Sequence, residues 1–188
     1  MLVNGYLEGD NIYSTVCDDH AAMYGAAAQL LQAGRKRILY LYTSYSYSGV
    51  NKLEGYKDAL KAYGMEPCDE LIRQCPKDIS AAKELLLSLH GQGLEFDAVM
   101  TSDDSLAVGT VKYAHASGIS IPDELNIIGY NNSILSQCTD PEITSIDSKV
   151  EALCTTTINT LMGVFSGVNV PSRTTIASDL IKRKTTNF

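Results

Sequence analysis

The sequence lacks the segments that mark export or membrane insertion. No basic stretch followed by an apolar one opens it, and no apolar run approaches the roughly 20 residues that a membrane-spanning helix needs. It also lacks an excess of basic residues, since the formal net charge is −7. Because DNA and anionic membranes both attract a basic surface, this charge argues against either partner for the chain itself. These absences predict a cytoplasmic protein without membrane contact.

Cysteine pairs are missing as well. The five cysteines are odd in number and scattered along the chain, and no two of them form a CxxC pair. A disulfide framework or a zinc site built on cysteine shows such pairing. We therefore expect reduced thiols, and neither disulfides nor a metal, at Cys17, Cys68, Cys75, Cys138 and Cys154.

Motifs of catalysis are also absent. No GxSxG, HExxH or P-loop pattern occurs, and the segment nearest to a phosphate loop, Ser48–Lys52, lacks the P-loop spacing. The three histidines lie in helical contexts without a nucleophile or carboxylate partner nearby in sequence. Asp103 and Asp104 are adjacent, but no further acidic or histidine residue recurs at a spacing that suits a metal. We therefore expect neither an enzyme nor a metal or cofactor site.

What the sequence does contain is a regular alternation of strand and helix patterns. Its hydrophobic content of 45% and charged content of 20% are typical of globular proteins. The predicted strands are 1–4, 12–17, 37–42, 71–74, 98–100, 125–130, 141–146 at a sheet edge, 174–177 and 180–181. The predicted helices are 19–33, 50–63, 78–89 including the cap, 104–117 and 150–165. This spacing predicts an α/β fold with a doubly wound parallel sheet.

Three of the predicted strands end in polar clusters. The clusters are Ser44–Ser48, Ser102–Asp104 and Asn131–Asn132, and Lys52 lies in the helical turn after the first of them. In a parallel sheet the carboxyl ends of the strands meet at one edge, where ligands bind. Serine, aspartate, asparagine and lysine beside tyrosines suit a polyol or another small polar metabolite. The alternative for the tyrosines is a loop that packs on itself.

Asp103 and Asp104 also fit a second role. Both stand where a helix begins, and a carboxylate at that position caps the helix by accepting a hydrogen bond from a free backbone N–H. One of the two is expected to cap, which leaves the other for ligand contact. We assign the cap to Asp104 and the ligand contact to Asp103.

Six stretches of the chain carry a family resemblance. In order they are RKRILYL, KLEGYKDAL, FDAVMTSDDSLAVG, IPDELNIIGYNN, PEITSID and DLIKRKTT. This succession resembles the effector-binding domain of the LacI/GalR transcriptional repressors, which are relatives of the type I periplasmic sugar-binding proteins. The resemblance runs from about Val3 to Thr186. It implies a periplasmic-binding-protein-like fold of type I, in which three strands cross between two α/β subdomains and the ligand lies in the cleft between them.

The resemblance also implies how the chain is divided. Residues 18–145 with 179–188 would form one complete subdomain, and residues 1–17 with 146–178 would form part of the second. The helix-turn-helix with which family members bind DNA is absent from this chain. Because the sequence opens almost directly on a strand, we expect a fragment or a truncated product.

Candidate effector contacts follow from the resemblance, position by position. The family's contacts fall on eight polar residues: Ser46, Tyr47, Ser48, Lys52, Asp103, Asn131, Asp18 and Asn4. Lys52 stands where the family has an arginine, and Asn131 where it has an aspartate. Lysine lacks the planar fork that binds in a bidentate manner, and asparagine removes a charge and adds a donor. These departures argue against an ordinary hexose effector without changing the class of site.

A homodimer is implied as well, because the family's dimer interface lies partly on this subdomain. The candidate interface residues lie on two helices and one turn: Ile79, Ala82, Leu86, Ser105, Val108, Lys112, Ile134 and Leu135. Core packing is the alternative for the apolar members, and we assign the neighbouring Leu85 and Leu106 to the core.

The function that the resemblance implies is sensing. A sugar or a similar small polar metabolite would bridge the two subdomains and favour one of their relative orientations. Operator DNA would be a partner only through the missing N-terminal domain. One alternative is a solute-binding receptor for transport, which would need an export signal upstream. Another is an enzyme on the same fold that uses Asp103 and Lys52.

Overall fold

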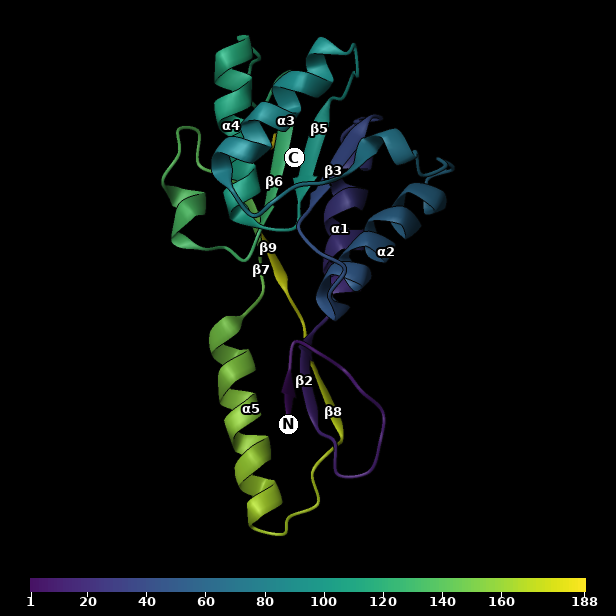
Figure 1. The fold of residues 1–188 in the computed structure, drawn as a ribbon, viewed down its shortest axis with the longest axis vertical. Helices are drawn as coiled ribbons and strands as arrows, with labels where there is room; N and C mark the ends of the chain where they lie inside the picture. Colours follow the sequence, from purple (N-terminus) through teal and green to yellow (C-terminus); the bar gives the residue numbers. More distant parts are fainter.

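The computed structural model describes all 188 residues, which form two parts arranged end to end (Figure 1). The larger part holds a six-stranded sheet with the order β4-β3-β5-β6-β7-β9, and the smaller part holds a three-stranded sheet with the order β1-β2-β8. The strands are β1 (Leu2–Val3), β2 (Ser14–Cys17), β3 (Ile38–Tyr42), β4 (Ile72–Gln74), β5 (Ala98–Thr101), β6 (Asn126–Tyr130), β7 (Thr144–Asp147), β8 (Arg173–Ile176) and β9 (Asp179–Ile181).

Five α-helices connect these strands. They are α1 (Asp19–Gln32), α2 (Tyr47–Ala62), α3 (Ile79–Gly91), α4 (Asp104–Ser117) and α5 (Val150–Phe165), with two short 3-10 turns, η1 (Asp69–Leu71) and η2 (Ile134–Gln137). All strand pairs are parallel except β7 with β9. This arrangement confirms the predicted doubly wound α/β fold. None of the helices combines the length and the apolar character that crossing a bilayer requires.

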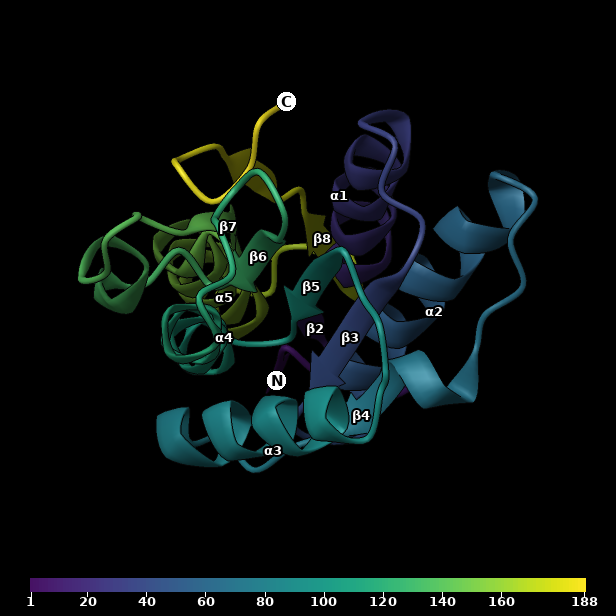
Figure 2. The same ribbon diagram turned by 90° about the horizontal axis from the view of Figure 1, so that it is seen from above.

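Strand β3 shows why both faces of the larger sheet are covered. All five of its residues are buried, and successive side chains of a strand point to opposite faces. Ile38 and Tyr40 join the core under α1 and α2, whereas Leu39 and Leu41 join the core under α3 and α4. Figure 2 shows one helix pair along each face of the sheet. Burial on both faces therefore explains why β3 is a continuous apolar run, without alternating polar residues.

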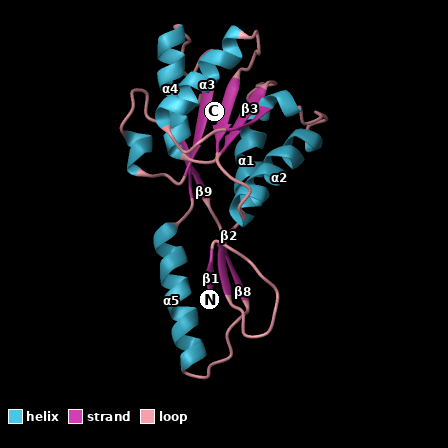
Figure 3. Ribbon diagram, in the orientation of Figure 1, coloured by secondary structure: helices cyan, strands magenta, loops and turns pink.

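Three passes of the chain join the two parts. Strand β2 leads into α1, β7 leads into α5, and β8 leads into β9 (Figure 3). Strands β8 and β9 belong to different sheets although only Ala177 and Ser178 separate them. Helix α5 packs against β2 and β8 of the smaller sheet. The carboxyl ends of β5, β6 and β7 therefore face the smaller part, because β7 continues directly into it.

Two local predictions are wrong. Residues 141–146 were expected to form an edge strand, but β7 lies between β6 and β9, because the short link after β8 returns the chain antiparallel beside it. Helix α2 begins at Tyr47 instead of residue 50, because Ser46 caps it: the Ser46 Oγ accepts a hydrogen bond of 3.1 Å from the Gly49 N–H.

The predicted dimer residues divide by burial. Ala82 and Leu86 are fully buried in the core between α3 and the sheet, so the prediction that they contact a partner is wrong. Ser105 and Val108 are also buried, at 7% and 6% exposure, because α4 packs against α3 and the sheet. The remaining members reach the surface in part or in full, and for them the interface stays a prediction: Ile79, Lys112, Ile134 and Leu135. Leu106 is fully buried, as expected, and Leu85 is half-buried.

Candidate functional site

Asp103 caps α4 at the point where β5 ends. Its Oδ1 accepts hydrogen bonds from the N–H and the Oγ of Ser105, at 3.0 and 2.7 Å. The expectation that Asp104 is the cap is therefore wrong. The Asp104 carboxylate is buried behind the helix start, where it accepts hydrogen bonds from the N–H and Oγ of Ser133 and from the Oγ of Ser145. Asp104 thus ties three segments of the larger part together.

The second oxygen of Asp103 lies at the sheet edge and joins two further segments. Its Oδ2 accepts a hydrogen bond of 2.9 Å from Asn131 Nδ2, just after β6, and lies 2.7 Å from Lys77 Nζ. Burial alone would raise the Asp103 pKa, but the hydrogen bonds from Lys77 and Ser105 outweigh burial and hold this pKa below its usual value. Asp103 therefore carries a negative charge at neutral pH. The structure brings Asp103 and Asn131 together, as the strand ends predicted.

Lys77 is a member of this cluster that the sequence analysis missed. It lies in the loop between β4 and α3, and β4 ends at the same sheet edge as β3 because the two strands are parallel. The polar segment after β4 could have been counted with the other three clusters. The signal was weak because β4 has only three residues.

Lys52 is buried and turned into the protein. Its Nζ lies 3.6 Å from the ring centroid of Tyr130, 3.4 Å from the Ser102 carbonyl oxygen and 4.0 Å from Asp19 Oδ1. The Tyr130 hydroxyl donates to the same Asp19 oxygen at 2.5 Å. Burial lowers the Lys52 pKa, and the charges of Asp19 and Asp103 oppose this effect. The Lys52 side chain, which is 10% exposed, is therefore engaged by groups of the protein itself.

The polar cluster after β3 makes contacts of its own. Ser46 is the cap of α2, and Ser48 is half-buried in the first turn of that helix. The hydroxyls of Tyr42 and Tyr45 are hydrogen-bonded to each other. Tyr47 reaches across to the smaller part, where its hydroxyl accepts a hydrogen bond of 3.0 Å from Arg173 Nη2. The loop thus packs partly on itself and partly on the other part of the molecule.

Asn4 and Asp18 lie where the smaller part meets the larger. Asn4 Oδ1 accepts a hydrogen bond of 3.3 Å from the Cys17 N–H, and Asp18 caps α1 by accepting 3.0 Å from the Ala21 N–H. No contact in the structure joins Asn4 or Asp18 to Asp103.

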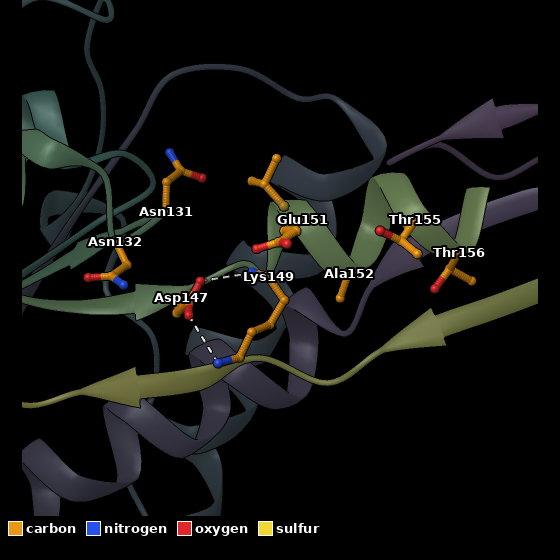
Figure 4. Close-up of a pocket in the computed structure, with 9 residues that line it drawn as sticks. Asn131, Asn132, Asp147, Lys149, Glu151, Ala152, Thr155 and Thr156 are labelled. Atoms are coloured by element: carbon orange, nitrogen blue, oxygen red, sulfur yellow. Dashed lines mark hydrogen bonds and ion pairs between the residues drawn. The ribbon is translucent and has the colours of Figure 1, made fainter. Parts of the chain in front are cut away.

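A pocket of about 730 Å³ opens between the end of β6 and the first turns of α5 (Figure 4). Most of its lining is polar. The polar lining residues are Asn131, Asn132, Asp147, Lys149, Glu151, Thr155 and Thr156, and the apolar ones are Val150 and Ala152. At its edge Lys149 Nζ pairs with Asp147 at 3.0 Å and with Asp179 at 2.8 Å, so it bridges the ends of β7 and β9. The pocket contains Asn131 but none of the other predicted effector contacts. Nowhere do three His, Cys, Asp or Glu side chains gather as a metal site would need.

Comparison with known proteins identifies the family. Residues 27–186 match the family described as periplasmic binding protein-like domain. An HTH-type transcriptional regulator of Lachnoclostridium phytofermentans is 55% identical over 188 residues, which are 100% of this chain and 56% of that protein. The HTH-type transcriptional regulator GalR of Escherichia coli is 28% identical over 185 residues, 98% of this chain and 54% of that protein.

A solved structure agrees with these relatives. A sugar-binding transcriptional regulator of the LacI family from Escherichia coli, complexed with phosphate, superposes with a TM-score of 0.90 at 27% identity, over 98% of this chain and 67% of that chain. The chain spans about half the length of the curated relatives it matches. These relatives are named as transcriptional regulators and not as enzymes, in agreement with the expectation from the absent motifs. The chain belongs to the periplasmic-binding-protein-like family, and the proteins it is similar to are HTH-type and LacI-family transcriptional regulators.

Proposed function

We propose that the chain is the effector-sensing part of a LacI/GalR-type transcriptional repressor that works in the cytoplasm. A sugar or a similar small polar metabolite would bind between the two parts and control DNA binding allosterically. The observation that carries this proposal is the hydrogen-bonded pair of Asp103 and Asn131, at the sheet edge that faces the smaller part. The name of the sugar-binding Escherichia coli neighbour supports the same class of ligand.

The two sheets support a division into subdomains. Residues 18–145 with 179–188 would form the complete subdomain, and 1–17 with 146–178 part of the other. A ligand that contacts both can favour one relative orientation, whereas equal affinity for both orientations would switch nothing. A homodimer, with the exposed Lys112 and Ile134 at its interface, belongs to the proposal, and operator DNA would be bound by a helix-turn-helix outside this chain.

The genomic sequence upstream separates this function from transport. A helix-turn-helix directly upstream is expected for the repressor, and an export signal in its place would instead make the chain a solute-binding receptor. An enzyme on the same fold would convert its ligand, so turnover of a bound metabolite by the purified protein would also contradict the proposal.

A thermal-shift screen on the full-length protein tests ligand binding. Neutral sugars, sugar acids, sugar phosphates, nucleosides and amino acids are compared, because a ligand that binds only the folded form raises its apparent stability. We expect at least one member to raise the melting temperature, and Asp103→Ala to weaken its binding about tenfold or more, since Lys77 and Asn131 lose the charged partner that positions them. Equal binding by wild type and variant would place the ligand elsewhere.

A further inference from the structure

Lys77 is the exposed charge at the edge of the candidate site. Its side chain is 64% exposed, whereas the side chain of its partner Asp103 is 10% exposed. The other charged pair, Lys52 and Asp19, is buried at 10% and 2%. A ligand that approaches this edge therefore meets an ammonium group before it meets a carboxylate.

The hydrogen bonds already made at this edge determine which donors and acceptors remain free for a ligand. Asp103 is largely used, because Oδ1 accepts twice from Ser105 and Oδ2 accepts from Asn131 and pairs with Lys77. An ammonium has three donors, and Lys77 spends one of them on Asp103, so two are free. The side-chain amide nitrogen of Asn131 donates to Asp103, and no group of the chain donates to the side-chain oxygen Oδ1 of Asn131. The groups that Asp103, Lys77 and Asn131 leave free are thus a cationic donor and a neutral acceptor.

We propose that Lys77 makes this site selective for a polyol that carries an anionic group, a sugar acid or a sugar phosphate, over a neutral sugar. The inference rests on the sensing function proposed above. The anionic group accepts hydrogen bonds from Lys77, and a neighbouring hydroxyl donates to the carbonyl oxygen of Asn131. Lys52 cannot take this role, because its ammonium is held over the Tyr130 ring and beside Asp19.

A neutral sugar has less to gain at the same edge. Its hydroxyls can donate to the side-chain carbonyl oxygen of Asn131, but they would have to displace Lys77 or Asn131 from Asp103 to reach the charged acceptor there. A neutral hydroxyl makes a weaker hydrogen bond to a carboxylate than an ammonium does. The ion pair between Lys77 and Asp103 therefore disfavours neutral ligands while it leaves part of the ammonium available to anionic ones.

Matched ligands test this selectivity on the full-length protein. Each set shares one carbon skeleton and consists of the neutral aldose, its aldonate and its phosphate ester, for aldoses of four to six carbons. Dissociation constants are measured by calorimetry for wild type and Lys77→Met. Lys36→Met is the control, because Lys36 is exposed at the amino end of β3, the opposite end of the same sheet.

We expect one anionic member to bind about tenfold or more tightly than its neutral counterpart, the size of a charged hydrogen bond. Lys77→Met should remove that advantage and leave the neutral member within about twofold, and Lys36→Met should change neither. The preferred member of the set tells a carboxylate from a phosphate. Equal binding of neutral and anionic members by wild type, or an equal loss for both in Lys77→Met, overturns the inference while the sensing function stands. If no compound of any charge class binds, the sensing function and this inference both fail.

Discussion

At the scale of single residues, Asp103 and Asp104 are adjacent in sequence, but their surroundings shift their pKa values in opposite directions. Burial alone would raise the pKa of both Asp103 and Asp104. For Asp103 the hydrogen bonds from Lys77 and Ser105 outweigh burial, so its pKa lies below the usual value. For Asp104 burial outweighs the hydrogen bonds from Ser145 and Ser133, so its pKa lies above the usual value. The two neighbours therefore affect the stability of the protein with opposite dependence on pH.

This difference predicts opposite effects of two matched substitutions. A carboxylate whose pKa is lowered by folding stabilises the protein above its unfolded-state pKa of about 3.9, and that contribution is lost as the pH falls through the folded pKa. A carboxylate whose pKa is raised by folding destabilises the folded state as the pH rises from its unfolded-state pKa through its higher folded pKa. Asp103→Asn should thus cost more free energy of unfolding at about pH 7 than at about pH 3, and Asp104→Asn less.

Urea unfolding of both variants and wild type at the two pH values measures these differences. An unchanged slope with urea concentration would show that the compactness of the end states is preserved. Each variant controls for the other, because both replace a carboxylate by an amide of the same shape. A change of the same sign for the two variants would contradict the assignment of their surroundings.

Asp103 and Asn131 were predicted as site residues, but the helix cap was assigned to Asp104, whereas Asp103 forms it. Strand ends can be located from local patterns, and parallel strands bring their carboxyl ends to one edge, so the pairing of Asp103 with Asn131 was predictable. Either aspartate fits a cap in sequence. Which aspartate caps the helix depends on Ser133 and Ser145, which lie 29 and 41 residues further along the chain and donate hydrogen bonds to Asp104. Such distant partners leave no local signal.

Among the elements, α1 and α2 approach each other closely at Gly55. A Cβ added at Gly55 of α2 would lie 2.3 Å from the carbonyl oxygen of His20, a backbone atom at the start of α1. A rigid backbone cannot yield as a flexible side chain would. Gly25 of α1 is the natural comparison, because a Cβ there would meet nothing within 4 Å.

We therefore expect Gly55→Ala to destabilise the protein by about 1–3 kcal/mol, the usual cost of overpacking. Gly25→Ala should instead stabilise it by about 0.5–1 kcal/mol, the helix preference of alanine over glycine. Free energies of unfolding from urea titration provide the comparison. Stabilisation by both substitutions would contradict the close approach of the two helices.

Most elements were predictable from the sequence because their patterns are local. The apolar periodicity located every helix and strand to within a few residues, and the cap at Gly118 ends α4 in the left-handed conformation that glycine favours. The place of β7 inside the sheet was not predictable. Its neighbour β9 follows only after α5 and β8, and Ser145 pairs with Ile181 across that whole segment.

At the scale of the whole molecule, two parts are joined by three passes of the chain and by a few side-chain contacts. Arg173 donates to Tyr47 across the two parts, and its guanidinium lies 4.8 Å from the ring centroid of Tyr6. The Cys17 Sγ donates to the Ser148 carbonyl oxygen at 3.0 Å and links two of the three passes. Contacts of this size stabilise one relative orientation without fixing it, because a ligand that contacts both parts can add more.

The central claim, that a ligand at this edge favours one orientation of the two parts, is tested most directly by the distance between them. Cys68 in the larger part and Cys154 on α5 are exposed, and Cys17 and Cys75 are buried, so Cys138→Ser leaves one exposed thiol on each part for spin labels. Pulsed electron resonance then gives the distribution of distances, with labelled protein diluted into unlabelled protein. With the ligand found by thermal shift we predict a narrower and displaced distribution, and with a non-binding sugar no change. A distribution that stays the same when the ligand is bound would contradict the account.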